Sequence, residues 1–493
     1  MFADKRRVNR REFLRLGGAG LTGAGLLLGG VGCGGGEGTG ENAIGWQAIP
    51  SYSPQAPDKK RVDYLNQSIS DWEGAYGEFT IDSLISSSDV TVAMARLLKQ
   101  ANEDRTPDIA QIDSYVFPRF YEYVYPLDGY LEETGVTDDY FPFIESLMLG
   151  DGGVVKGLQF TTDVRVLYYR KDLVPEPPAS WDEVLEVGRD LKDEGLSPYL
   201  FPAGRDEATV TTSLWPYFWA QGGELVDTEG NPVFGEGENR EKMLSCLKFI
   251  RECVASGITP TRVTTYLQET DLNADINAGE VGMFLGGNWQ VGILKEVTGE
   301  EEFTSTWGVA PIPSMEGGDT HATTAGGWIW GIFAGDEAKQ RAAVDFLLYT
   351  FVGDRGMAGW CNAGGYLPPR QDVFDFSEYQ GNEYTETFRE HLDKYARNRP
   401  ASEAYQNIST AMQVAVASVV TEDASPEHHV AEVGAAALCV AAYTVPHGPC
   451  VRELWSRVQQ HAHPPLPFEL GAAGLANGLF HGAHRRSGSL QVL

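Results

Sequence analysis

The sequence predicts an α/β protein that contains a parallel sheet, and three observations lead to this fold class. The chain has 493 residues, of which 42% are hydrophobic and 11% aromatic, so it is long enough for two or three globular domains. Strand-like and helix-like runs alternate from residue 43 to residue 115, and further extended runs follow between residues 154 and 334. Such alternation is typical of strand–helix–strand units with right-handed crossovers.

The first alternating segment predicts three strands separated by two helices. The strands are expected at 43–52, 80–86 and 108–115, and the helices at 62–79 and 89–107. In a parallel sheet, ligands bind beyond the carboxyl ends of the strands. Asp113, Ser114 and Tyr115 fall at such an end, so we expect them near a ligand.

The middle of the chain predicts a second set of elements. Two short extended runs lie within 154–174, and Ser180 is placed to cap a helix that follows it. An aromatic helix is expected within 212–227 and another helix within 240–257. Cys246 and Cys253 lie two turns apart on the latter, roughly 10 Å, which is too far for a disulfide, so we expect two core thiols.

The stretch "FLGGNWQVG" at 284–292 ends a predicted short strand. Its two glycines allow a sharp turn or a close approach of the backbone to another group, and Asn288 and Trp289 follow at once. The residues alone allow a core corner or a ligand platform at this place. Extended runs are expected again at 306–318 and 322–334, and helices from there to about Ser425.

The formal net charge of −31 excludes two classes of partner. Nucleic acids and anionic lipid surfaces both attract basic proteins, so we expect neither to bind this chain. Attachment to a membrane would have to be covalent.

Residues 1–33 are expected to be an export signal. Arg10 and Arg11 precede a weakly apolar, glycine-rich run and resemble a twin-arginine motif, although a soluble helix with an incidental arginine pair is the alternative. Cys33 resembles a bacterial lipoprotein cleavage site, with Gly30 where that pattern prefers leucine. Residues 34–41 would then be a flexible tether between a lipidated Cys33 and the folded protein.

Residues 426–493 differ in kind from the rest. From Glu427 onward there is no lysine, aspartate, isoleucine or methionine, whereas most of the histidines lie there. This tail is interpreted either as a disordered extension or as a frameshifted reading frame. A metal site formed by Cys439, Cys450 and histidines is disfavoured because the spacings match no ligand pattern.

From about Ile44 to about Pro426 the chain resembles a family, the extracellular solute-binding proteins of ABC importers, in its sugar-binding group. The resemblance is carried by segments in a fixed order: "TPDIAQIDSY", "FTTDVRVLYYRKDL", "PASWDEVLE", "LWPYFWAQGGELVD", "INAGEVGMFLGGNWQ", "TTAGGWIWGI" and "YLPPRQDV". It implies two hinge-linked α/β lobes with a central ligand cleft, residues 42–160 with 312–368 and residues 161–311 with 369–425. It further implies a monomer that binds a sugar without a cofactor, delivers it to permease subunits, and catalyses no reaction. Its place would be the outer face of the cytoplasmic membrane or the periplasm.

The resemblance also selects candidate ligand-binding residues, because a sugar ring has apolar C–H faces and a rim of hydroxyl groups. The candidates are Asp113, Tyr115, Asp163, Trp215, Trp219, Asn288, Trp289, Gly326, Gly327, Trp328 and Arg370. Trp289 is expected to stack on the sugar.

Some candidates have structural alternatives. Asp113 could cap a helix, Trp215 and Trp219 could be core residues, Trp330 could replace Trp328, and Arg370 could pair with a surface carboxylate. Two other functions remain open: a secreted carbohydrate-active enzyme with paired carboxylates, and the same fold binding a polyamine or peptide.

Overall fold

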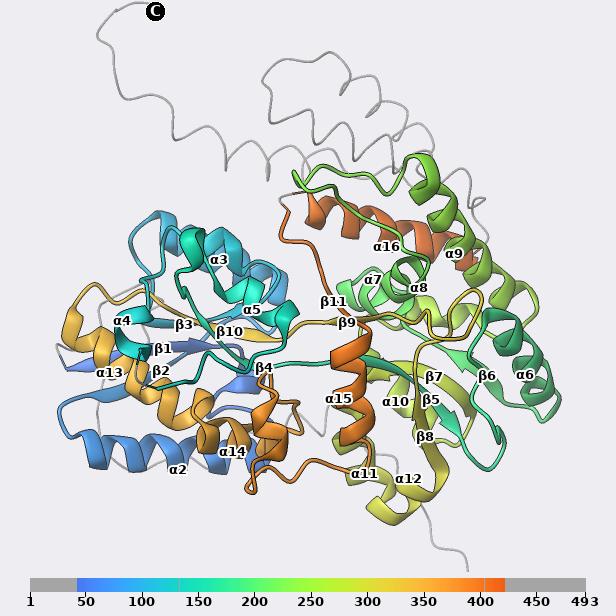
Figure 1. Cartoon of the computed structure of the whole chain (residues 1–493). Coiled ribbons are helices and arrows are strands. Elements are labelled where there is room, and N and C mark those ends of the chain that lie inside the picture. Colours follow the sequence, from blue (N-terminus) through green and yellow to red (C-terminus); the bar gives the residue numbers. More distant parts are fainter. Residues whose placement is uncertain (1–41, 133, 403, 422–493) are drawn as a thin grey trace, which may run out of the picture. The chain divides into compact units, whose positions relative to one another are not determined.

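The computed structural model describes residues 42–132, 134–402 and 404–421. The expectations for the export signal, the tether and the tail, including Arg10, Arg11, Cys33, Cys439 and Cys450, lie outside these residues. Two large sheets and a small two-stranded sheet organise the described part of the chain (Figure 1).

The first sheet has five strands in the order β2-β1-β3-β10-β4. Strand β1 pairs in parallel with β2 and β3, whereas β10 runs antiparallel to β3 and β4. The parallel unit predicted from the sequence is therefore confirmed, and β10 adds an antiparallel strand whose direction the sequence did not indicate. The strands are β1 (Ala43–Ala48), β2 (Thr80–Ile85), β3 (Ile109–Asp113), β4 (Leu158–Thr161) and β10 (Trp328–Ile332).

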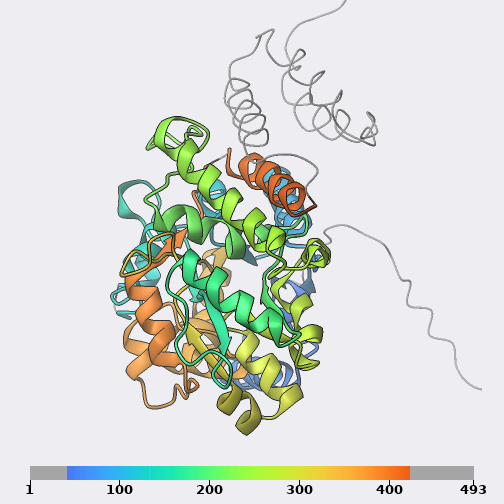
Figure 2. The ribbon, with the colours of Figure 1, turned by 90° about the vertical axis from the view of Figure 1, so that its right-hand side faces the viewer.

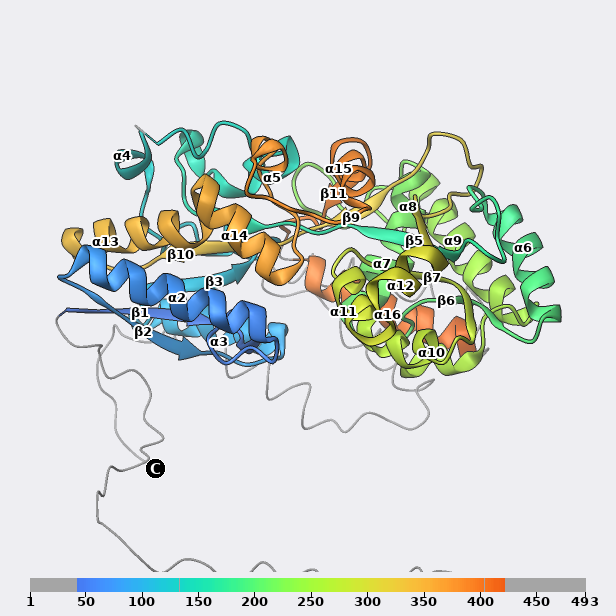
Figure 3. The same ribbon diagram turned by 90° about the horizontal axis from the view of Figure 1, so that it is seen from below.

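The two crossover helices of this sheet start at aspartate caps. The Asp58 side chain accepts a hydrogen bond from the backbone of Arg61 at the start of α2 (Lys59–Tyr76), and Asp89 accepts one from Val92 at the start of α3 (Val90–Asn102). Because β1 lies between β2 and β3, right-handed crossovers place these helices on opposite faces of the sheet (Figures 1 and 3).

The second sheet has four strands in the order β6-β7-β5-β8. Strand β6 is parallel to β7, and β5 is antiparallel to β7 and β8. These strands are β5 (Arg165–Arg170), β6 (Ser197–Leu200), β7 (Val281–Gly287) and β8 (Trp307–Ala310). The two extended runs predicted within 154–174 thus exist as β4 and β5, but they belong to different sheets.

The helices beside the second sheet confirm two local predictions. Ser180 caps α6 (Trp181–Asp193), and Glu183 completes a capping box with it. Cys246 and Cys253 are buried free thiols on α9 (Gly237–Ala255). Helix α16 (Tyr405–Thr421) packs against α9 (Figure 2).

Shorter elements complete the described part of the fold. They are α4 (Asp128–Leu131), α5 (Pro142–Met148), α7 (Glu207–Ser213), α8 (Trp215–Ala220), α10 (Asn273–Asn277), α11 (Gln290–Thr298), α12 (Glu300–Thr306), α13 (Glu337–Leu347), α14 (Asp354–Gly364), α15 (Thr385–Lys394), β9 (Thr323–Ala325) and β11 (Ala396–Asn398).

Several segments that run between the two sheets are tied together. The chain passes from β4 to β5 between Thr161 and Arg165, and returns between β8 and β10. Strand β9 on the return path pairs in parallel with β11, and a β-bridge joins Val164 to Ala325. Side chains near these crossings can therefore reach residues of both sheets.

The glycine pair of "FLGGNWQVG" does not form a turn; of the two alternatives, the structure shows the close approach. Gly286 and Gly287 are the last residues of β7 and pair with Val166 and Arg165 of β5. Glycine is needed there for space: a Cβ on Gly287 would lie 2.2 Å from the Trp289 ring. The indole of Trp289 therefore folds back over the backbone of Gly287.

Gly327 is the position where a side chain is expected to cost most. Its φ is +124°, and a Cβ there would lie 2.0 Å from the carbonyl oxygen of Thr161. We therefore expect Gly327→Ala to lower the free energy of unfolding by about 2–4 kcal/mol, measured by urea denaturation. The matched control is Gly292→Ala on α11, where the Cβ meets open space and the change should stay within about 1 kcal/mol. Equal midpoints for both variants would contradict this explanation.

Candidate ligand-binding site

Arg399, which sequence reasoning did not select, joins residues from the two sides of the crossings. Its Nη2 donates a hydrogen bond to Oδ1 of Asp113 over 2.7 Å, and its Nη1 lies 3.5 Å from Oε1 of Glu207. Asp113 ends β3 of the first sheet, whereas Glu207 begins α7. The guanidinium also lies over the Tyr115 ring, 4.0 Å from its centroid. Asp113 and Tyr115 thus meet at one place, as their position at a strand end predicted.

Burial and charge oppose each other in this group. Burial raises the pKa of Asp113 above its ordinary value, Arg399 counteracts the rise, and the carboxylates of Asp163 and Glu207 add to it. Burial alone would lower the pKa of Arg399, but Asp113, Tyr405 and Glu207 raise it, so the guanidinium stays charged. Arg399 is about nine-tenths buried, and its Nε has no hydrogen-bond partner within the described part of the chain.

Trp215 lies behind this group as a core residue. It is fully buried, and its Nε1 donates a hydrogen bond over 3.0 Å to the Tyr405 hydroxyl, which in turn hydrogen-bonds to Glu207. The Tyr405 ring meets Tyr115 edge-on with centroids 5.2 Å apart. Trp215, a ligand-binding candidate, is therefore a core residue, which was the alternative given for it. It holds Tyr405 in place.

Trp219 shares a helix face with Trp215, as predicted, with ring centroids 6.5 Å apart. It is also largely buried, and the guanidinium of Arg397 covers its ring at 5.4 Å from the centroid. Arg397 is itself paired with Glu224 over 2.9 Å.

Trp289 and Asp163 meet at a second arginine. The guanidinium of Arg165 lies 4.9 Å from the centroid of the half-buried Trp289 ring. The same guanidinium forms an ion pair with Asp163, and its Nε lies 3.4 Å from Oε1 of the buried Glu269. Arg165 and Glu269 were also missed by sequence reasoning, because nothing near them in the sequence marks the contact.

We call Arg399 with Asp113, Tyr115 and Glu207, and Arg165 with Asp163, Glu269 and Trp289, the two arginine groups. Gly326 lies between them. A Cβ at this position would come within 3.3 Å of Nη2 of Arg399 and 3.7 Å of Oδ1 of Asp163. A side chain here would crowd Arg399, so glycine allows both side chains to approach the backbone closely. Gly327, the next residue, makes a backbone contact: its carbonyl oxygen accepts a hydrogen bond from the backbone nitrogen of Ser114.

Asn288 fixes the first crossing segment. Its Oδ1 accepts a hydrogen bond from the backbone nitrogen of Val164 over 3.1 Å, and its own backbone nitrogen donates to the carbonyl of Val164. Because Val164 lies between Asp163 and Arg165 in the sequence, this contact helps to hold both of them in position.

Trp328 and Trp330 lie in different surroundings. Trp330 is fully buried and stacks on Phe160, with centroids 4.5 Å apart, so it is a core residue and not an alternative to Trp328. Trp328 is partly exposed and packs against Tyr52, whose pKa burial raises, with further contributions from Tyr366 and Asp163.

The structure does not bring Arg370 into either arginine group. The side chain is buried in ion pairs with Asp354 and Asp372, and its Nη1 donates a hydrogen bond to the carbonyl of Val352. Carboxylates beside it in the sequence and from α14 satisfy its charge. The alternative of a structural ion pair therefore describes Arg370, except that the guanidinium is buried.

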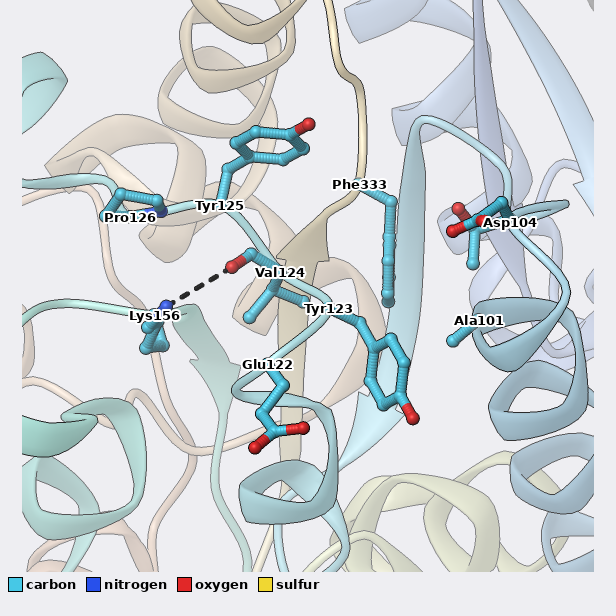
Figure 4. Close-up of a pocket in the computed structure, with 10 residues that line it drawn as sticks. Ala101, Asp104, Glu122, Tyr123, Val124, Tyr125, Pro126, Lys156 and Phe333 are labelled. Carbon is cyan, nitrogen blue, oxygen red and sulfur yellow. Dashed lines mark hydrogen bonds between the residues drawn. The ribbon is translucent and has the colours of Figure 1, made fainter. Parts of the chain in front are cut away.

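Two hollows of about 520 Å³ each lie elsewhere. One is found where the chain enters β3 and leaves β10, at the other end of the first sheet from Asp113, and Tyr123, Tyr125, Lys156 and Phe333 contribute to its walls (Figure 4). The other is lined by residues such as Phe141, Gln371 and Arg389. Neither hollow is lined by the residues of the two arginine groups.

Taken together, the two arginine groups offer carboxylates that accept hydrogen bonds, guanidinium groups that donate them, and aromatic rings from both sides of the crossings. This combination suits a small ligand with many hydroxyl groups and apolar faces. Within residues 42–421, apart from positions 133 and 403, no cluster of histidine, cysteine or carboxylate side chains could hold a metal ion. No helix among the same residues is long and apolar enough to cross a membrane.

Comparison of the sequence with known proteins finds relatives named as binding proteins. The chain is 25% identical over 309 residues to a binding protein of Brucella abortus, covering 61% of this chain and 71% of the relative. It is 26% identical over 242 residues to a maltooligosaccharide ABC transporter solute-binding lipoprotein of Streptococcus pneumoniae, covering 45% of this chain and 52% of the relative.

Solved structures show the same fold. The structure of T. maritima MalE3 with bound maltose superposes with a TM-score of 0.66 at 20% identity, covering 81% of this chain and 99% of the other. The predicted fold class, that of the two-lobed periplasmic binding proteins, is thereby confirmed. The sequence profile of the bacterial extracellular solute-binding proteins matches residues 68–387, so this chain belongs to that family.

Proposed function

We propose that this protein captures a mono- or oligosaccharide outside the cytoplasm and delivers it to the permease subunits of an ABC importer. The observation that carries the proposal is the position of Arg399, which contacts Asp113 and Tyr115 at the end of β3 and Glu207 at the start of α7. A ligand held at this place touches residues from both sides of the crossings.

The chemistry of these groups fits a sugar. Carboxylates accept hydrogen bonds from hydroxyl groups, and guanidinium groups donate hydrogen bonds to them. The rings of Tyr115 and Trp289 offer planes for the apolar faces of a pyranose. Within the described part of the chain, Nε of Arg399 has no hydrogen-bond partner, so it is a donor that a hydroxyl oxygen can satisfy. The relatives that bind maltose and maltooligosaccharides support the same ligand class.

Delivery follows from closure of two lobes about the crossings. We assign residues 42–160 and 312–368 to one lobe and residues 161–311 and 369–425 to the other. A ligand that contacts both lobes favours the closed form by its difference in affinity for the two states. The permease then recognises the closed form, and the sugar is passed on without a chemical step.

A thermal-shift screen of the purified full chain tests this function. The panel contains mono- and oligosaccharides, with polyamines and peptides as alternative ligands. A saccharide at a hundred times its dissociation constant stabilises the protein by about 2.7 kcal/mol, which raises the melting temperature visibly. Stabilisation by polyamines or peptides alone would reject saccharides as the ligand class but leave the fold assignment unchanged. Cleavage of a stabilising saccharide would favour the enzyme alternative.

We further propose that Cys33 carries a lipid that holds the monomeric protein at the outer face of the membrane, after export directed by Arg10 and Arg11. The expected result of Cys33→Ala is a protein found in the soluble extracytoplasmic fraction, because the acyl chains are its only anchor in this account. Fractionation and immunoblotting measure the change, with Cys361→Ala, at a buried thiol, as the matched control. A Cys33→Ala protein that stays with the membrane would contradict the lipid anchor.

A further inference from the structure

The groups around Arg165 and Arg399 contain more carboxylates than cations. Each guanidinium is shared by two carboxylates: Arg165 by Asp163 and Glu269, and Arg399 by Asp113 and Glu207. Four carboxylates therefore face two guanidinium groups, which leaves an excess of two negative charges when all are ionised. The nearby Arg397 does not change this balance because it is paired with Glu224.

Water screens this excess only weakly. The side chains of Glu269, Arg399 and Asp113 are 4%, 9% and 11% exposed. Like charges that are removed from water repel each other strongly, and Asp163 and Glu207 accordingly help to raise the pKa of Asp113. A positively charged ligand would relieve this repulsion, whereas an anionic ligand would increase it.

Asp163 is the carboxylate placed to meet a ligand. Among the hydrogen bonds of the described residues, its side chain accepts one, from Arg165, whereas Glu207 accepts from Tyr405 and Ser409. Glu269 and Asp113 also accept one each, from Thr212 and Arg399, but their side chains are 4% and 11% exposed against 21% for Asp163. The carboxylate of Asp163 lies against Gly326, where a Cβ would be 3.7 and 3.8 Å from the two oxygens. Its charge acts both on Asp113 and on Tyr52, which lies beside Trp328.

Resting on the proposed function, we propose that the site selects saccharides by charge and that Asp163 is the residue that determines this specificity. Saccharides with a protonated amino group bind most tightly, neutral saccharides follow, and saccharides with a carboxylate are rejected. The two arginines do not attract an anion because each is already held by two carboxylates.

Matched saccharides test the selection. Isothermal titration calorimetry of the full chain at neutral pH compares series built on glucose, galactose and maltose, in which a single C6 position carries a hydroxyl, an amino group or a carboxylate. In each series that binds, the amino form should bind about tenfold more tightly than the neutral parent, and the carboxylate form about tenfold more weakly. Asp163→Asn should lower the ratio of the affinities for the amino and carboxylate forms by about tenfold. This holds whatever the substitution does to the affinity for the neutral saccharide.

The control is Asp375→Asn, which removes the same charge from an exposed ion pair with Arg389 and should leave the ratio unchanged. The charge selection is overturned if the neutral saccharide binds and all three forms bind with equal affinity, or if the carboxylate form binds most tightly. Either result leaves the proposed function standing. A ratio that Asp163→Asn does not alter rejects the role of Asp163. Absence of saturable binding in every series rejects both proposals. If the variant does not fold, the ratio of the affinities for the amino and carboxylate forms, measured on the parent protein, still tests the charge selection.

Discussion

Replacing Arg399 by methionine is expected to lower the free energy of unfolding by about 3–5 kcal/mol. The substitution keeps the unbranched apolar stem of the side chain but removes the guanidinium, which leaves Asp113 and Glu207 close together without their shared cation. Removal of one partner from a buried ion pair costs more than the pair contributes, because the remaining charge stays out of water. Urea denaturation followed by circular dichroism measures the loss.

Arg389→Met is the matched control for Arg399→Met. Arg389 forms a pair with Asp375, whose side chain is 72% exposed, so its loss should cost no more than about 1 kcal/mol. If the two variants lost the same stability, Arg399 would not act as the buried cation that joins the two sides of the crossings.

Trp289→Ala is expected to weaken saccharide binding by about thirtyfold or more, which corresponds to about 2 kcal/mol or more. The variant removes the aromatic plane at the end of β7 and also the surface on which the guanidinium of Arg165 rests. A fluorescence or calorimetric titration with a saccharide that stabilises the parent protein measures the affinity.

Two further variants separate these contributions. Trp289→Phe keeps an aromatic plane and should lose much less affinity, whereas Tyr349→Ala removes an exposed aromatic ring away from the arginine groups and should lose none. Parent affinity in Trp289→Ala would mean that the indole supports Arg165 without touching the ligand.

Local patterns in the sequence predicted much of the fold. The cap at Ser180, the strand that ends at Asp113 and the helix that carries Cys246 and Cys253 each depend on residues within a few positions of one another. The antiparallel direction of β10 could not be read in this way, because it depends on the path by which the chain returns from the second sheet.

The site was less predictable than the fold. Asp113 and Tyr115 were selected as candidates because they follow a predicted strand, but their partner Arg399 lies 286 positions after Asp113. Nothing in the local pattern distinguishes Arg399 from Arg370, yet the fold brings the first to Asp113 and the second to Asp354 and Asp372. The closely spaced arginines of "ARNRP" in a strongly acidic chain were the one signal that could have drawn attention to Arg399.

Equilibrium dialysis of the full chain with a labelled saccharide, followed by chromatography of the recovered sugar, tests the capture of a sugar most directly. We expect saturable binding of about one saccharide per chain, recovery of the sugar unchanged, and much weaker binding by Trp289→Ala. A sugar that is not retained at any concentration, or one that is recovered cleaved, would contradict this expectation.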